Sequence, residues 1–100
     1  AGFLAQGGHG CISVTANVAP KLTSMLHSHW QKKNYKEFDK INLKLAPLSK
    51  ILFAEPNPTP AKYALSLMGK CKADVREPLY ELSLDTKKQV RKIIKDLNFI

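Results

Sequence analysis

A single β-strand is predicted in a sequence that otherwise reads as helical, and this imbalance constrains the fold more than any other feature. The strand lies within GGHGCISVTANVAP, residues 7–20, at about residues 10–14, where Ile12 and Val14 alternate with Ser13. A lone strand leaves both rows of backbone N–H and C=O groups without partners and is not stable in water. We therefore expect this strand to pair with strands that lie outside the 100 residues.

Two helices are predicted around this strand. The first covers residues 1–6 and should end at Gly7, because glycine readily adopts the left-handed backbone that closes a helix. The second covers about residues 20–31, with Asn17 as its N-cap and Pro20 in its first turn. A helix–strand–helix order is typical of a β/α barrel or a doubly wound sheet, whose other strands would lie N-terminal to this chain.

The rest of the sequence predicts three more helices and a proline-rich connector. Apolar residues at helical spacing indicate a helix over about 35–53, kinked at Pro47 because proline removes one backbone hydrogen bond. The connector EPNPTPAK, residues 55–62, is held extended by its prolines. A further helix is expected over about 60–69, and the last begins at an N-cap on Ser83.

The charge balance raises the possibility of a nucleic-acid partner. The sequence has 16 basic and 8 acidic residues, for a formal net charge of +8. Its only arginines are Arg76 and Arg91, although arginine is favoured for reading bases and phosphates. The densest basic stretch, residues 87–95, has apolar residues at helical spacing and indicates an amphipathic helix with a solvated lysine face. We therefore expect a solvated surface and no nucleic-acid partner.

Composition favours one folded domain. Apolar residues make up 44% of the chain and charged residues 24%, which argues against disorder. No apolar run reaches the roughly 18 residues of a membrane span, so no membrane partner is expected. Cys11 and Cys71 are too few for a disulfide framework, which favours a reduced, cytoplasmic chain. The opening residues 1–4 contain no initiator methionine and no signal peptide, which indicates a section of a longer polypeptide.

Two blocks of the sequence carry a family resemblance that extends over essentially the whole chain. The first is GxISVTANVAP, formed by Gly10 and residues 12–20, and the second is LFAEPNPTPAK, residues 52–62. A looser match, R-x-PL, lies at residues 76–79. The sequence resembles the C-terminal third of the 4-hydroxy-tetrahydrodipicolinate synthase (dihydrodipicolinate synthase) family. That family belongs to the pyruvate-dependent class I aldolases, together with N-acetylneuraminate lyase.

The resemblance implies an α/β fold, a (β/α)8 TIM barrel of about 250 residues followed by a small C-terminal helical domain. Residues 1–33 would be the end of the barrel: the end of helix seven, strand eight at about 10–14, and helix eight. Residues 34–100 would form the C-terminal helical domain. This segment would be mostly α-helical and would need the N-terminal part of the barrel to be complete.

The implied reaction is that of a lyase that condenses pyruvate with aspartate semialdehyde, on the route to lysine and diaminopimelate. A lysine amine forms a Schiff base with pyruvate and turns its methyl carbon into an enamine nucleophile; no cofactor is implied. The family places this lysine on the sixth strand, upstream of this segment, so neither Lys21 nor Lys62 is assigned the role. The resemblance therefore implies a homotetrameric enzyme of which this chain alone is inactive.

One substrate-binding position carries over from the family. Ile12 matches the residue whose backbone contacts pyruvate at the mouth of the barrel, where the ends of the strands assemble such sites. Without the resemblance, an isoleucine in a buried strand would simply be a core residue. No catalytic and no metal-binding residue is assigned in this segment.

Other combinations of reactive residues are weaker. His9 and Cys11 could both bind a metal, but a structural zinc site needs four ligands. Ser13 and Thr15 have no His–Asp arrangement near them in sequence, so a hydrolase triad is unsupported. The glycines of residues 7–10 precede the strand, whereas a dinucleotide-binding fingerprint places them after it.

Two functional hypotheses follow. In the first, the chain is a section of a lyase and is catalytically meaningful only within the complete barrel. In the second, it is a non-catalytic remnant or a helical association module. For the isolated chain we expect self-association through the unpaired strand around Ile12, because open strand edges readily pair with another chain.

Overall fold

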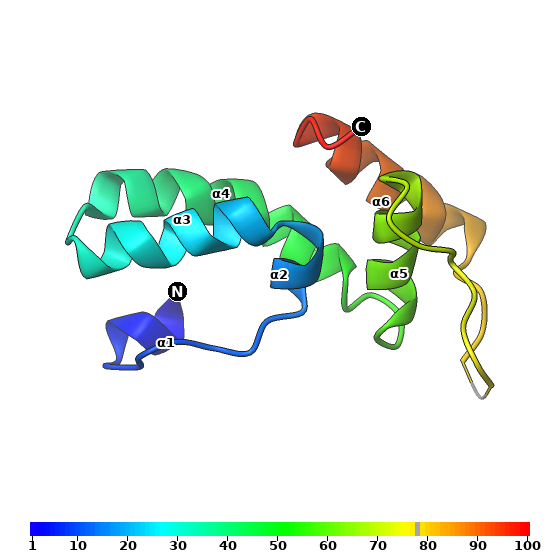
Figure 1. The fold of residues 1–100 in the computed structure, drawn as a ribbon, viewed down its shortest axis with the longest axis horizontal. Helices are drawn as coiled ribbons and strands as arrows, with labels where there is room; N and C mark the ends of the chain where they lie inside the picture. The colour runs from blue at the N-terminus through cyan, green and yellow to red at the C-terminus, as the bar shows by residue number, and fades with distance from the viewer. Residues whose placement is uncertain (78) are drawn as a thin grey trace.

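The computed structural model describes residues 1–77 and 79–100 of the chain. The described residues form six helices and contain no β-strand. In chain order the helices are α1 (Gly2–Ala5), α2 (Thr15–Val18), α3 (Pro20–Gln31), α4 (Tyr35–Ile51), α5 (Thr59–Leu67) and α6 (Leu84–Asp96). Figure 1 shows α3 and α4 side by side at one end of the molecule and α5 with α6 at the other. Pro78, in the R-x-PL stretch, lies outside the described residues.

The strand predicted at residues 10–14 does not form in this chain, so that prediction is wrong for the structure described. Residues 8–13 have no regular secondary structure, and Val14 has a helical backbone, with φ −65° and ψ −41°. A strand needs a neighbour to receive its backbone hydrogen bonds, and none of the described segments is a strand. The segment instead crosses below α3 as an open connection (Figure 1).

The helix after this segment begins at the predicted residue, but its N-cap is a different residue from the one predicted. Asn17 lies inside α2, where its Nδ2 donates a hydrogen bond to the carbonyl oxygen of Val14 at 3.4 Å. The N-cap of α3 is Ala19, which supplies no side-chain hydrogen bond. Pro20 still starts α3, because its fixed φ suits the first helical turn. The prediction for Asn17 is wrong because the chain makes a separate helical turn before α3.

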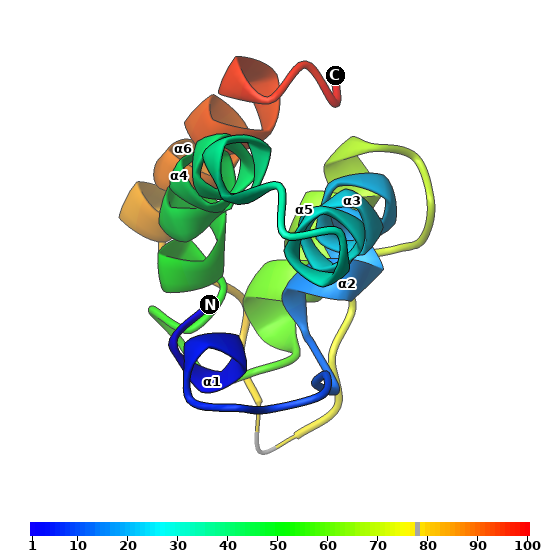
Figure 2. The same ribbon diagram turned by 90° about the vertical axis from the view of Figure 1, so that its left-hand side faces the viewer.

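An antiparallel pair formed by α3 and α4 builds one end of the core, and Figures 1 and 2 place α1 beneath this pair. The ring of Trp30 in α3 lies 5.2 Å from that of Tyr35 and 5.1 Å from that of Phe38, centroid to centroid. Lys33 turns the chain between the two helices with φ 58°. The buried face of α4 consists of Phe38, Ile41, Leu45, Leu48 and Ile51.

The longest helix, α4, continues through Pro47, and the kink expected there stays a prediction. Proline lacks the N–H that would bond to the carbonyl four residues earlier, at Leu43. Leu43 is exposed, so water can hydrate that carbonyl. No helix in the described part of the chain is both long enough and apolar enough to cross a membrane.

The second group of helices, α5 and α6, packs on the far end of α4 and on α2. As predicted, α5 ends just before Gly69, which has φ 74°. The N–H of Lys70 bonds to the carbonyl of Leu65 at 2.9 Å, and that of Gly69 bonds to Ser66 at 3.1 Å. These two bonds form the Schellman arrangement that a left-handed glycine allows.

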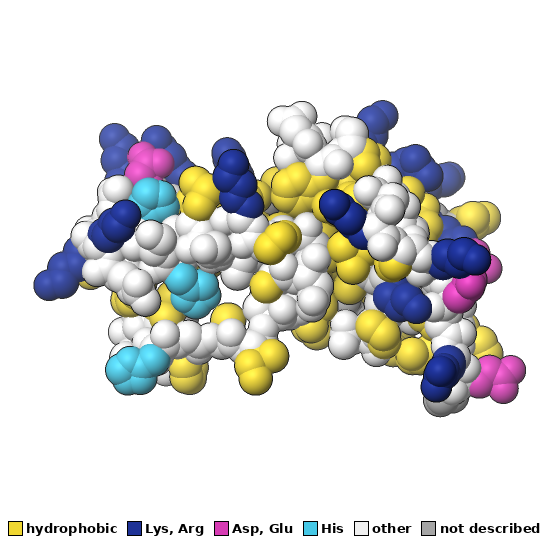
Figure 3. All heavy atoms as spheres, in the orientation of Figure 1, with side chains coloured by type: hydrophobic (Ala, Val, Ile, Leu, Met, Phe, Trp, Pro, Cys, Tyr) yellow, Lys and Arg dark blue, Asp and Glu magenta, His cyan; other side chains and the backbone are white. Residues whose placement is uncertain are grey.

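The final helix begins at the predicted N-cap. The hydroxyl of Ser83 accepts a hydrogen bond from the backbone N–H of Thr86 at 3.3 Å. Val90 and Ile94 are fully buried, while Lys88, Lys92 and Lys95 of α6 are exposed and Lys87 is half-buried. The amphipathic pattern predicted at residues 87–95 is therefore confirmed. Figure 3 shows Lys and Arg side chains spread over both ends of this face of the molecule.

Candidate functional site

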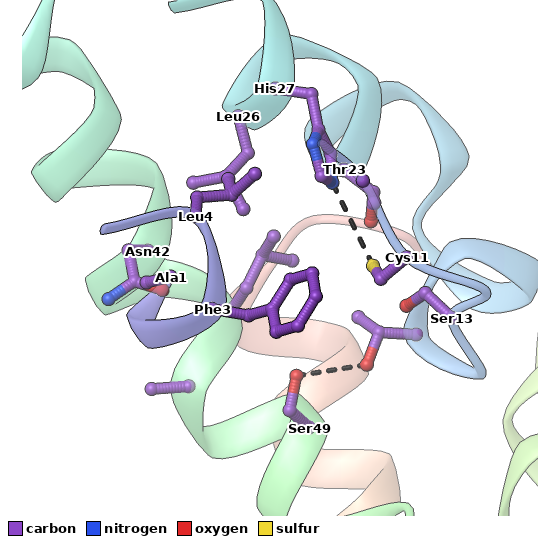
Figure 4. A pocket seen from close by; sticks show the side chains of 14 residues that line it. Ala1, Phe3, Leu4, Cys11, Ser13, Thr23, Leu26, His27, Asn42 and Ser49 are labelled. Atoms are coloured by element: carbon purple, nitrogen blue, oxygen red, sulfur yellow. Dashed lines mark hydrogen bonds between the residues drawn. The ribbon is translucent and has the colours of Figure 1, made fainter. Parts of the chain in front are cut away.

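A pocket of about 430 Å³ lies where the N-terminal segment crosses α3 and α4 (Figure 4). Residues of α3 and α4 line it together with residues of the N-terminal segment, namely Ala1, Phe3, Leu4, Gly10, Cys11, Ser13 and Thr15. Phe3, Leu4 and Leu26 make part of the wall apolar. The polar side chains of the lining are Cys11, Ser13, Thr15, Thr23, His27, Asn42 and Ser49. The pocket thus gathers reactive groups that lie far apart in the sequence.

A thiol and an imidazole meet in this pocket. The Sγ atom of Cys11 lies 3.9 Å from Nε2 of His27 (Figure 4). Cys11 is exposed, and His27 is half-buried on α3. A ring nitrogen can accept the proton of a thiol, so the pair has the composition of a nucleophile beside its base.

Hydroxyl groups fix the course of the segment next to this pair. Thr15 Oγ1 lies 2.9 Å from Ser49 Oγ and ties the start of α2 to α4. Ser13 Oγ accepts a hydrogen bond from the backbone N–H of Ala16 at 3.2 Å. Thr23 Oγ1 is buried and has no hydrogen-bond partner among the described residues. The hydrogen bonds of Ser13 and Thr15 are therefore structural.

The predicted substrate-binding residue, Ile12, points away from the pocket. Its relative exposure is 107%, whereas Cys11 and Ser13 on either side of it line the pocket. Successive side chains therefore still alternate between two sides, as in a strand, although no strand forms. The backbone contact between Ile12 and pyruvate stays a prediction.

The other residues that the sequence singled out lie apart from one another. Cys11 contacts His27 on α3, while His9 is exposed and lines a different pocket. Within residues 1–77 and 79–100, no three His, Cys, Asp or Glu side chains are grouped so that they could hold a metal. Lys62, one of the two lysines to which the Schiff-base role was not assigned, donates through Nζ to the backbone carbonyl of Asp74.

The proline-rich signature block has a structural contact of its own. Glu55 Oε2 accepts hydrogen bonds from Ser83, at 3.1 Å from its hydroxyl and 3.3 Å from its N–H. A hydrogen bond from the side chain of Thr86 is the largest influence on this carboxyl, and with those from Ser83 it lowers the pKa of Glu55 against the opposing effect of desolvation. These bonds fasten the connector to the start of α6.

The pairing of Cys11 with His27 was missed by the sequence reasoning. The two residues are 16 positions apart, and no motif spacing joins them. Their contact depends on the path of an irregular segment beneath α3, which local periodicity does not encode. The weak signal available was the position of Cys11, two residues before Ser13, on one side of the alternating stretch.

Comparisons with known proteins agree on one family. The model of the dihydrodipicolinate synthetase family matches residues 1–97. The 4-hydroxy-tetrahydrodipicolinate synthase of Bradyrhizobium diazoefficiens is 49% identical over 90 residues, a match that covers 90% of this chain and 30% of that enzyme.

Solved structures give the same result. The dihydrodipicolinate synthase of Thermotoga maritima superposes with a TM-score of 0.93 at 39% identity, over 97% of this chain and 33% of that one. The chloride-inhibited enzyme of Acinetobacter baumannii, complexed with pyruvate, gives a TM-score of 0.87 at 39% identity, over 94% and 32%. The chain spans about a third of the length of the relatives it matches. Since the family model matches nearly every residue, the chain belongs to the dihydrodipicolinate synthetase family.

Proposed function

We propose that this chain is the C-terminal part of a cytoplasmic lyase that condenses pyruvate with aspartate semialdehyde through a lysine Schiff base, in lysine and diaminopimelate biosynthesis. The observation that carries the proposal is the match of the family model to residues 1–97. The relative from Acinetobacter baumannii, solved with pyruvate, supports pyruvate as the substrate. Both cysteines are free, which is in keeping with a reducing compartment.

In this proposal, residues 1–33 are the end of a (β/α)8 barrel and residues 34–100 are the C-terminal helical domain. The helix α3 takes the place of the eighth barrel helix. Residues 10–14 become the eighth strand once neighbouring strands supply hydrogen bonds. The alternation around Ile12 supports this, because its side chain points away from the helices, toward the side that a barrel would occupy.

The 100-residue chain alone is proposed to be inactive, because the family's Schiff-base lysine belongs to another part of the barrel. Incubation with pyruvate followed by borohydride reduction should leave the intact mass of the chain unchanged. A pyruvate-dependent adduct on any lysine of the chain would contradict this proposal.

A chimera tests the full activity. Residues 1–100 would replace the matching third of the Bradyrhizobium diazoefficiens synthase, with which they share 49% identity. The chimera should condense the two substrates and form the borohydride-trapped adduct, whereas the same relative without its C-terminal third should do neither. A chimera that folds and assembles but traps no pyruvate would argue against the proposed function.

The same chimera tests Ile12. A backbone contact is insensitive to a conservative side-chain change, so Ile12→Val should keep the KM for pyruvate. Proline fixes φ and removes the N–H, so Ile12→Pro should raise that KM by about tenfold or more, the loss expected for a hydrogen bond to a charged group. Equal KM values for the two variants would remove Ile12 from the site.

The second candidate is a non-catalytic association module, and the exposed apolar side chains of the N-terminal segment favour it. Phe3 and Ile12 are 66% and 107% exposed. Sedimentation of the isolated chain should show self-association that Ile12→Asp weakens, and a strictly monomeric chain at high concentration would count against it. In the complete enzyme, we propose the homotetramer that is usual for the family.

A further inference from the structure

The two cysteines of the chain are both exposed, but their neighbours differ in chemistry. Cys11 Sγ lies 3.9 Å from the ring nitrogen Nε2 of His27. Cys71 Sγ donates to the backbone carbonyl of Lys62 at 3.7 Å. A carbonyl oxygen favours the protonated thiol, which is the donor, whereas a neutral imidazole can remove the proton. The chain therefore contains its own comparison between a thiol beside an imidazole and a thiol beside a backbone carbonyl.

The form of a cysteine that attacks electrophiles is the thiolate. About 3% of a free cysteine is ionised at pH 7, because the pKa of a free thiol is about 8.5. An adjacent imidazole raises the reactive fraction by accepting the proton and then stabilises the thiolate as an imidazolium. Complete ionisation could increase the rate of attack by at most about thirtyfold over a free thiol.

The pocket also offers room and a polar contact for a small reagent. Its volume is about 430 Å³, and Phe3 and Leu26 give it an apolar wall. Thr23 Oγ1, buried and without a partner among the described residues, belongs to the same lining. Its hydroxyl can donate to an oxygen atom of a molecule held near Cys11, as the arrangement in Figure 4 indicates.

We infer that Cys11 is a site of covalent modification by small, soft electrophiles, with His27 as the base that activates it. The sulfur attacks the electrophilic carbon and forms an S–C bond. The thiol proton passes to Nε2 of His27, and the leaving group departs with the electron pair of the bond that breaks. The inference does not depend on the proposed synthase function, since it rests on contacts within the chain.

The test follows both cysteines in one sample. The folded 100-residue chain is treated with iodoacetamide at pH 7, and peptide mapping measures the rates of carbamidomethylation of Cys11 and Cys71. Cys11 should react about tenfold faster, within the ceiling set by full ionisation. Equal rates, or a faster Cys71, would overturn the inference.

Two variants separate the base from other effects. His27→Gln should lower the rate of Cys11 to that of Cys71 and leave Cys71 unchanged. His29→Gln is the matched control on the same helix, because His29 does not line the pocket and its Nδ1 lies 3.3 Å from Nδ2 of Asn34. A His27→Gln chain that keeps a fast Cys11 would overturn the assignment of the base.

A measurement in urea keeps the test decisive if His27→Gln loses its helices. In the unfolded native sequence Cys11 and His27 separate, so the ratio of the two rates should fall to about one. A ratio that persists in urea would overturn the inference, because it would come from the local sequence and not from the folded contact.

Discussion

Removing the hydroxyl of Ser83 tests how far the last helix depends on its N-cap. Ser83 Oγ accepts from the N–H of Thr86 at 3.3 Å and lies 3.1 Å from Glu55 Oε2, to which it donates. Ser83→Ala would leave the N–H of Thr86 without its side-chain acceptor. It would also take one donor from Glu55, which fastens the proline-rich connector to α6. Two separate parts of the chain are thus weakened by the loss of one oxygen atom.

The size of the effect follows from these two bonds. Loss of a serine N-cap costs about 1 kcal/mol, and a partly exposed hydrogen bond contributes about 0.5 kcal/mol more. The free energy of unfolding should therefore fall by about 1.5 kcal/mol. For a domain of this size, that corresponds to a melting temperature lower by about 6–12 °C.

Thermal unfolding followed by far-UV circular dichroism measures the change. Ser83→Thr keeps a capping hydroxyl and should melt close to the native sequence, while Ser24→Ala removes an exposed hydroxyl inside α3 and should change stability by less than about 0.5 kcal/mol. Because Ser83 and Glu55 are bonded, Ser83→Ala combined with Glu55→Gln should lose less than the sum of the single variants. The reasoning would be refuted if the Ser83→Ala chain had the same melting temperature as the Ser24→Ala chain.

Three further changes probe the core, the connector and a turn. Leu48→Ala, at a position with 0% exposure, should lower the free energy of unfolding in urea by about 2–5 kcal/mol, whereas Leu43→Ala, at 74% exposure, should leave it nearly unchanged; equal losses would contradict the assigned core. The lowered pKa of Glu55 means that its stabilisation is present above the ordinary value of 4.5 and is lost as the pH falls through the lower folded value. The difference in melting temperature between the native chain and Glu55→Gln should therefore shrink in acid, and a constant difference would count against it. Gly69→Ala should cost about 1 kcal/mol because φ is 74°, while Gly10→Ala, in open space, should cost less in the same melting assay.

Most helices could be predicted from the sequence because their signals are local. Pro20 begins α3, Gly69 follows α5 and Ser83 caps α6, each through its own backbone or side chain. Apolar spacing located the buried faces for the same reason, since helical neighbours lie three and four residues apart. Asn17 failed as a cap because an additional helical turn, α2, forms before α3, and no single residue announces it.

The strand and the reactive pair could not be obtained in this way. A strand forms only when another strand pairs with it. The β-branched pattern around Ile12 therefore shows a preference for extended backbone, but no strand among the described residues is present to pair with this segment. The contact between Cys11 and His27 arises from the crossing of two segments that are separated by 16 positions. Both features depend on tertiary arrangement, to which residue type and spacing contribute little.

The segment around Ile12 nevertheless keeps the side-chain order of a strand without its hydrogen bonds. Cys11 and Ser13 face the pocket bounded by α3 and α4, and Ile12 faces solvent. The helices thus supply one of the two environments that a barrel strand requires, and only the opposite side and the backbone edges lack a partner among the described residues. The chain as a whole superposes on a synthase about three times as long with a TM-score of 0.93, over 97% of its residues. In the proposed complete barrel, neighbouring strands would pair with the backbone edges of this segment and other side chains would pack on the Ile12 side, without refolding of the helices. The Cys11–His27 contact, on the other side of the segment, should therefore persist in the chimera.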